Sequence, residues 1–120
     1  MSKILNINDG IKINKDNVDF GSLAMISVVS KATYEDGTEI KTFTLNATGY
    51  NGFALLSVAT ANNNGNLYYV LVRNGTIHAV DKIVNMEPDT MISYTNMQLS
   101  VKMGSWANAT LIDFGNNSWS

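Results

Sequence analysis

Residues 97–103 alternate between apolar and polar side chains without a break. The apolar members are Met97, Leu99, Val101 and Met103, and the polar ones between them are Gln98, Ser100 and Lys102. A period of two is typical of a β-strand that turns one face to a core and the other to water. Nowhere in the sequence do apolar residues recur convincingly at helical spacing over three turns. We therefore expect a mainly antiparallel, all-β chain.

The polar part of the composition favours the same fold class. Only 15% of the residues are charged, against roughly 25% in typical soluble domains. Asn, Thr, Ser and Gly supply the polar surface instead, as in the runs 62–66 and 115–118, and these residues favour turns over helices. With 120 residues, the chain has the length of one ordinary domain with its own core.

Two short turn signals divide the β-prone stretches. Asp36-Gly37 separates the stretches 23–34 and 39–46, and Asn74-Gly75 separates 67–73 from 76–81. Glycine takes the positive φ that a tight two-residue turn requires, so both sites predict β-hairpins.

The remaining β-prone stretches complete a sandwich. They cover 53–59, 91–102 and 109–114, and the single proline, Pro88, falls in a predicted loop at 85–90. About eight to ten short strands at this spacing predict an antiparallel β-sandwich of jelly-roll type. We expect this sandwich domain to span 21–120. Residues 1–20 are predicted to form an N-terminal hairpin or attachment segment, with its turn at 8–10.

Two strands are apolar on both faces. They lie around Leu55 and at 67–72, and in a sandwich only one face of each can meet the core. Large apolar patches are uncommon on monomers, so the second face predicts self-association. The alternative is that a loop or the N-terminal hairpin covers it. The predicted oligomer interface consists of Leu55, Tyr68, Tyr69 and Leu71.

Charge and cysteine content exclude several classes of function. The net charge is -2 and the single arginine, Arg73, has no basic neighbours in its strand, which argues against nucleic-acid binding. Cysteine is absent, so disulfides and Cys-ligated metals are excluded. No signal-peptide pattern and no run of about 18 apolar residues occurs, and we expect synthesis in the cytoplasm without membrane insertion.

Candidates for catalysis are few. His78 is the only histidine, which favours a structural or surface role. Asp81 and Asp113 lie near strand ends, where a sandwich could bring them together as a glycosidase pair. The oxygen-rich run 14–19 fails the EF-hand pattern, because Phe20 stands where a loop glycine belongs. We expect no enzyme activity, no cofactor and no metal.

Binding has better support than catalysis. The aromatic residues Tyr34, Tyr50 and Trp106 lie at or beside predicted turns, close to amides and hydroxyls. Aromatic faces beside neutral hydrogen-bonding groups suit sugars, although loop aromatics also cap cores or fill subunit interfaces. The predicted ligand-binding residues are Tyr50, Asn51, Asn62, Asn63, Asn64, Trp106 and Asn108.

The order of segments between Gly49 and Gly115 resembles the C-terminal head domains of bacteriophage tail fibres and related receptor-binding proteins. The segments that carry the resemblance are GFALLSV at 52–58, GNLYYVLV at 65–72, MQLSVK at 97–102 and ANATLIDF at 107–114. The resemblance implies a homotrimeric β-sandwich on the virion, at the tail or capsid surface, that contacts other virion proteins and binds a host-surface glycan or protein. The family has no fixed catalytic residues to transfer.

Nothing before Gly21 resembles a fibre repeat, which departs from the family pattern. A capsid decoration or tail adaptor protein is therefore a second interpretation. A carbohydrate-binding module of a glycan-active protein is a third, and a small glycan-degrading enzyme that uses Asp81 or Asp113 is a fourth.

Overall fold

The structure is a computed structural model that describes residues 12–13, 18–19, 26–34, 37–47, 51–88 and 90–120. These residues form β-strands joined by turns, with no helix among them. The strands are β1 (Lys12–Ile13), β2 (Val18–Asp19), β3 (Ile26–Ala32), β4 (Glu39–Ala47), β5 (Gly52–Ala59), β6 (Gly65–Arg73), β7 (Thr76–Asn85), β8 (Met91–Tyr94), β9 (Gln98–Met103), β10 (Asn108–Phe114) and β11 (Ser118–Trp119).

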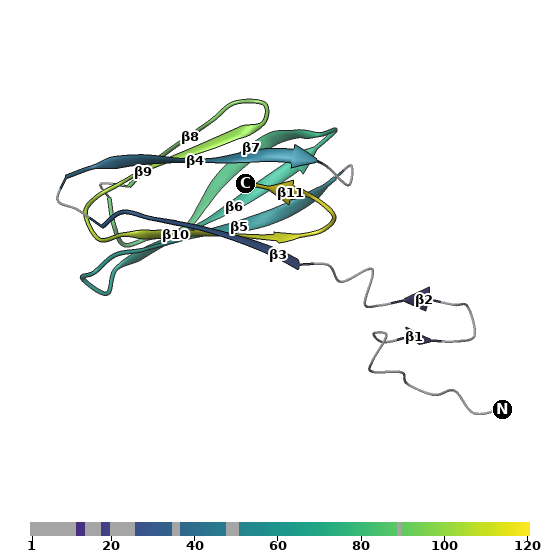
Figure 1. Cartoon of the computed structure of the whole chain (residues 1–120), viewed down its shortest axis with the longest axis horizontal. Helices are drawn as coiled ribbons and strands as arrows, with labels where there is room; N and C mark the ends of the chain where they lie inside the picture. The colour runs from purple at the N-terminus through teal and green to yellow at the C-terminus, as the bar shows by residue number, and fades with distance from the viewer. Residues whose placement is uncertain (1–11, 14–17, 20–25, 35–36, 48–50, 89) are drawn as a thin grey trace.

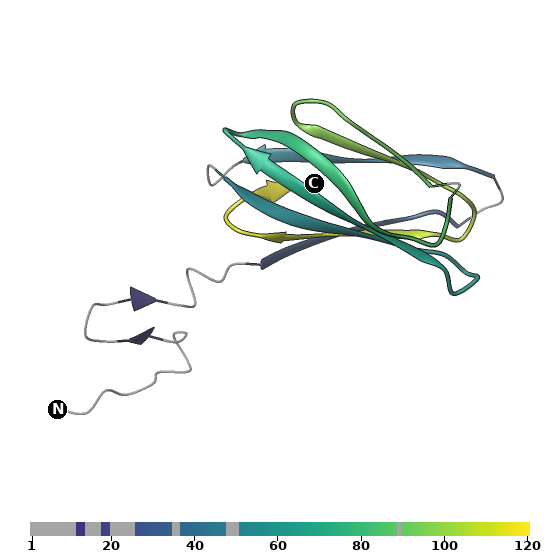
Figure 2. The same ribbon diagram turned by 180° about the vertical axis from the view of Figure 1, so that it is seen from behind.

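Nine of these strands form two antiparallel sheets that lie one over the other (Figure 1, Figure 2). One sheet has five strands in the order β3-β10-β5-β6-β7, and the other has four in the order β11-β4-β9-β8. The predicted antiparallel β-sandwich is confirmed, whereas its jelly-roll type stays a prediction. The short strands β1 and β2 pair with each other. The predicted turn at 8–10 lies outside the described residues.

The core lies between the two sheets and follows the period-two pattern. On β9, Leu99, Val101 and Met103 are fully buried, as their alternation predicts. They face Leu56 and Val70 of the five-stranded sheet in one apolar cluster. Burial of a side chain of this size stabilises the fold by roughly 1.5–3 kcal/mol.

Met97 fits the alternating sequence pattern of 97–103, but it is not buried like the apolar residues of β9. Its side chain is 43% exposed, because it precedes the strand and lies in the turn from β8. The Met97 carbonyl accepts a hydrogen bond from the Leu45 amide at 2.7 Å. The stretch 91–102, predicted as one strand, is thus two strands that pair as a hairpin. The short β11 was not predicted.

The hairpin predicted at Asn74-Gly75 is confirmed. Arg73 pairs with Thr76, and β6 and β7 run antiparallel from that turn. Asn74 has φ 52° and Gly75 has φ 76°, so both central residues are left-handed, as a type I′ turn requires.

The hairpin predicted at Asp36-Gly37 is wrong. β3 pairs with β10 in one sheet, and β4 pairs with β9 and β11 in the other, so the chain crosses between sheets here. β3 and β4 instead face each other from the two opposite sheets. Lys31 Nζ donates a hydrogen bond to the Thr42 carbonyl at 2.6 Å and lies 5.3 Å from the centre of the Phe43 ring. A glycine turn reverses the chain, but strand partners elsewhere in the sequence decide which sheet each arm joins.

Candidate functional site

The connections of the sandwich gather at two opposite ends, and the predicted ligand-binding residues divide between them. One end, here called the Trp106 end, carries the β3–β4, β5–β6, β7–β8 and β9–β10 connections; it lies on the left in Figure 1. Asn62, Asn63, Asn64, Trp106 and Asn108 all lie there, because Ala59 at the end of β5 pairs with both Asn108 and Gly65.

Asn51 lies at the opposite end. Its Oδ1 accepts a hydrogen bond from the Asn74 amide at 3.4 Å, beside the β6–β7 turn. The eight residues of β5 place about 26 Å between the two ends, so Asn51 does not share a site with Trp106. Tyr50 lies outside the described residues.

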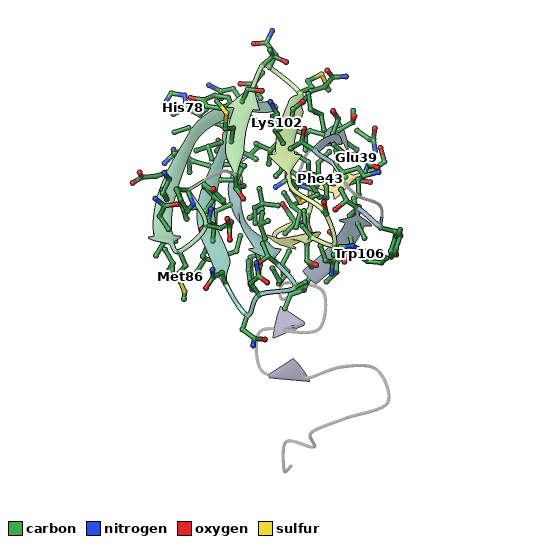
Figure 3. All side chains as sticks on the ribbon, turned by 90° about the vertical axis from the view of Figure 1, so that its left-hand side faces the viewer. Glu39, Phe43, His78, Met86, Lys102 and Trp106 are labelled. Atoms are coloured by element: carbon green, nitrogen blue, oxygen red, sulfur yellow. The ribbon has the colours of Figure 1, made fainter. Side chains whose placement is uncertain are left out.

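The Trp106 end holds a groove of about 430 Å³ flanked by two exposed aromatic side chains. Tyr34 is 69% exposed and Trp106 is 57% exposed. Ser30 and Asn108 line the same groove and contribute a hydroxyl and an amide. Figure 3 looks onto this end of the sandwich, with Trp106 at its periphery and Phe43 inside. The aromatic groove therefore combines apolar ring faces with neutral hydrogen-bonding groups.

Trp106 has a backbone conformation that aromatic residues rarely adopt. Its φ is 52°, and a left-handed conformation costs a residue other than glycine roughly 1–2 kcal/mol. Such strain persists only where the surroundings enforce it, and it concentrates at functional sites. The strained turn directs a large apolar ring to the surface instead of into the core.

Thr33 is the residue that holds this turn. It is 2% exposed, and its hydroxyl donates a hydrogen bond to the Gly104 carbonyl at 2.7 Å. The same oxygen accepts one from the Ala107 amide at 3.0 Å, and the Thr33 amide donates to the Ala107 carbonyl at 2.9 Å. Both sides of Trp106 are therefore fixed to the end of β3, next to Tyr34.

Ser105 attaches the same turn to the β3–β4 connection. Its hydroxyl oxygen accepts a hydrogen bond from the Gly37 amide at 2.9 Å, and the hydroxyl donates to the Gly37 carbonyl at 3.2 Å. The turn is thus held from two directions, which reduces the conformational entropy that a ligand would have to remove on binding.

A second hollow, of about 590 Å³, lies on the other side of the 104–106 turn, and we call it the polar pocket after its charged and amide groups. Gly104 and Ser105 line it on one side, and the predicted residue Asn62 contributes an amide. Glu87 and Lys102 add one charge of each sign. This polar pocket and the aromatic groove share the 104–106 turn, so one extended ligand could reach both.

Asn66 positions the loop that brings Glu87 to the polar pocket. Its side chain is 3% exposed. Its Oδ1 accepts hydrogen bonds from the Met86 and Glu87 amides, both at 2.8 Å. Its Nδ2 donates to the Glu87 carbonyl at 2.8 Å and to the Tyr68 hydroxyl at 2.9 Å. No spacing in the sequence connects these residues with Lys102, so the pocket was not predicted.

Asp81 and Asp113 do not form a carboxylate pair. Asp113 is fully buried between the sheets, where it accepts hydrogen bonds from Asn117 and Trp119. Asp81 is exposed and accepts one from the Lys82 amide. Asp113 faces the core and Asp81 faces outward. His78 is exposed on β7. Over the ranges that the structure describes, no group of three or more His, Cys, Asp or Glu residues could hold a metal ion.

Three of the four predicted interface residues share one surface. Leu55, Tyr69 and Leu71 lie on the outer face of the five-stranded sheet, each half-buried. The prediction for Tyr68 is wrong, because its side chain is 2% exposed and belongs to the core. Alternation along β6 places neighbouring residues on opposite faces, so Tyr68 and Tyr69 cannot both face outward.

The chain matches no family model, no curated protein and no solved structure. Among the described residues there is no helix of the length and apolarity that crossing a membrane requires. The fold defines the class of this protein, an antiparallel β-sandwich.

Proposed function

We propose that this protein is a non-enzymatic virion appendage protein, the head domain of a phage tail fibre or a related structure, that binds a host-surface glycan in the aromatic groove. The observation that carries the glycan part is the placement of Tyr34 and Trp106 in one groove on a doubly anchored turn. The resemblance of residues 49–115 to tail-fibre heads supports the virion part. Other virion proteins would be its structural partners.

The chemistry of the groove suits a neutral sugar. The C–H face of a pyranose ring can stack on the indole of Trp106 or the phenol of Tyr34, as other apolar surfaces do on aromatic side chains. Its hydroxyls can then exchange hydrogen bonds with Ser30 and Asn108. Among the described residues, no charged side chain lines this groove, so stacking and neutral hydrogen bonds are its means of binding a sugar.

The polar pocket supports a longer ligand. A chain of sugars that crosses the 104–106 turn would place its next unit against Asn62, Glu87 and Lys102. Their amide, carboxylate and ammonium groups can exchange hydrogen bonds with the polar substituents of that unit. We therefore place an oligosaccharide, rather than a single sugar, across the two hollows.

The test is binding of the labelled protein to a glycan array and to candidate host cells. Trp106→Ala and Tyr34→Ala are expected to weaken binding at least tenfold, since loss of an aromatic hot-spot residue costs about 2 kcal/mol or more. Tyr94→Ala is the matched control, because Tyr94 is 43% exposed but lies on β8, outside the groove. Glycan binding that both groove variants retain in full would overturn the assignment of the site.

A decoration or adaptor protein is the second candidate. It is favoured by the apolar outer face of the five-stranded sheet, which suits contact with protein rather than sugar. This candidate predicts binding to other virion proteins and no binding to glycans or cells. The same array therefore separates the two.

A further inference from the structure

The outer face of the five-stranded sheet carries two adjacent rows of apolar side chains. The register aligns them across four strands, so that Phe114 faces Phe53 and Ile112 faces Leu55. We call this set the outer apolar face; it consists of Ile26, Phe114, Phe53 and Leu71 in one row, and Val28, Ile112, Leu55 and Tyr69 in the next. The third row begins with the hydrogen-bonded hydroxyls of Ser30 and Thr110.

The aromatic members of this face are ordered by contact with one another. The Phe53 ring stacks on Phe114 with 5.2 Å between ring centres, and on Tyr69 with 5.6 Å. Stacked rings have few rotamers left to lose, so a partner that packs on them removes little side-chain entropy. These three rings are therefore held in place by one another before any partner binds.

The outer face of the other sheet has the opposite character. Its central positions are polar, with Thr42 and Thr44 on β4 opposite Ser100 and Gln98 on β9. The hydroxyls of Thr42 and Ser100 lie 3.1 Å apart in a hydrogen bond. This is the usual solvated face of an antiparallel sheet. Ile40 and Met91 are exposed on this face too, but among the described strands adjacent apolar rows across four strands lie on the five-stranded sheet alone.

The apolar rows also extend to the edge strand β3. Ile26 and Val28 are each 58% exposed, and the one charged residue of β3, Lys31, bonds inward to Thr42. The opposite edge strand, β7, carries Asp81 and Lys82 and has two irregularities in its pairing with β6. Charges and bulges are the usual protection of an edge. On β3 the single charge, Lys31, lies beyond Ile26 and Val28, so the part of this edge beside the apolar rows carries no charge of its own.

We propose that copies of this chain associate through the outer apolar face, sheet against sheet. The outer apolar face, two rows on four strands about 4.8 Å apart, covers roughly 250 Å² in plan, which is about half of the outer face of the whole sheet. Two copies packed over the whole outer face of the sheet would bury on the order of 1,000 Å², the lower limit expected of a biological interface.

The charges at the margin of the face are compatible with a second copy. Arg73, at the end of β6, and Asp81, on β7, carry opposite signs. A face that carries one charge of each sign does not repel its own copy, and a self-complementary apolar surface is what an isologous interface requires. The association does not depend on glycan binding, because the aromatic groove and the apolar rows are separate sets of residues.

The test is the mass of the full chain in solution by light scattering, over a dilution series. We expect a dimer, and we expect Val28→Lys and Ile26→Lys to lower the mass to that of a monomer, because each places a charge in the buried interface. Ile40→Lys is the matched control: Ile40 is 65% exposed, but on the other sheet. Circular dichroism checks that every variant is folded.

A wild-type monomer at every concentration would overturn the proposal and leave the face to a different protein. An oligomer that Ile40→Lys dissociates and Val28→Lys does not would also overturn it, since the interface would then lie on the four-stranded sheet. Neither result changes the expected outcome of the glycan array. The proposal of self-association can therefore fail while the proposal of glycan binding stands, and the reverse.

Discussion

The indole Nε1 of Trp119 donates a hydrogen bond to Oδ1 of Asp113 at 3.0 Å. Asp113 belongs to β10 in the five-stranded sheet, and Trp119 belongs to β11 in the other. The same carboxylate accepts two more hydrogen bonds, from the Asn117 amide and side chain. A residue that the sequence suggested as a catalytic acid instead closes one end of the sandwich.

Asp113→Asn should lower the free energy of unfolding by about 2–3 kcal/mol, because an amide places an N–H group where a carboxylate oxygen now accepts a bond. Urea denaturation measures the change. Asp81→Asn is the matched control: Asp81 is exposed, and its substitution should change stability by about 0.5 kcal/mol or less. Equal losses in the two variants would contradict the role assigned to Asp113.

Thr33→Val should destabilise the fold by about 1–3 kcal/mol. The change keeps the shape of the side chain but removes the hydroxyl that binds Gly104 and Ala107, and it leaves buried polar groups without that partner. Glycan affinity should fall too, although the rings of Tyr34 and Trp106 are unchanged, because the turn between them is less well held. Calorimetry on wild type, Thr33→Val and the control Thr44→Val would measure both effects. Full affinity in Thr33→Val would show that the turn keeps its shape without the hydroxyl.

Trp106→Gly should be more stable than Trp106→Ala by about 1 kcal/mol. Both changes delete the indole, but only glycine adopts a φ of 52° without steric cost. This order is opposite to the one expected at an ordinary position, where alanine is the more stabilising residue. Thermal unfolding of the two variants measures the difference, and both should have lost glycan binding. A more stable alanine variant would mean that the left-handed backbone at residue 106 is absent in solution.

Stability should also decline in alkaline solution through Tyr68. Burial raises the pKa of Tyr68 above its ordinary value of 10.0, and the hydrogen bond from Asn66 offsets part of that rise. Above pH 10 the unfolded chain loses the phenolic proton before the folded chain does, so the free energy of unfolding falls as the pH rises. Below pH 10 this contribution is complete.

Denaturant unfolding between pH 9 and pH 11.5 would isolate this effect as the difference between wild type and Tyr68→Phe. The wild type should lose more stability over that range than Tyr68→Phe, whereas Tyr94→Phe should behave like the wild type. Identical pH profiles for wild type and Tyr68→Phe would show that Tyr68 does not contribute.

Local patterns predicted the local parts of this fold. The Asn74-Gly75 turn and the alternation along 97–103 each depend on a few adjacent residues, and both are present in the structure. The Asp36-Gly37 turn failed because the sheet that each flanking strand joins depends on distant partners. β3 takes its place beside β10, about 80 residues further along the chain, and no turn residue encodes that choice.

The candidate site likewise has residues that the sequence predicted and residues that it did not. Trp106, Asn108 and the 62–64 run were predicted because aromatic and amide residues beside turns are visible in a sequence. Thr33 and Asn66, which hold the two loops in place, are ordinary polar residues in the sequence, and their roles come from burial and from partners 20 to 74 positions away. Asn51 was predicted to belong to the same site because it also lies beside a turn. Proximity to a turn does not say at which end of a sandwich that turn lies, and Asn51 lies at the opposite end from Trp106.

The aromatic groove and the outer apolar face occupy different stretches of the same two strands, β3 and β10. In an assembly that buries the apolar rows, every copy would therefore carry its groove at a fixed distance from the next one. A repeating polysaccharide could occupy several grooves at once, and its avidity would exceed the affinity of one groove by about 10²–10⁴ without any new contact. Under the proposed function, weak stacking on two rings would then be enough to keep a virion bound to a cell.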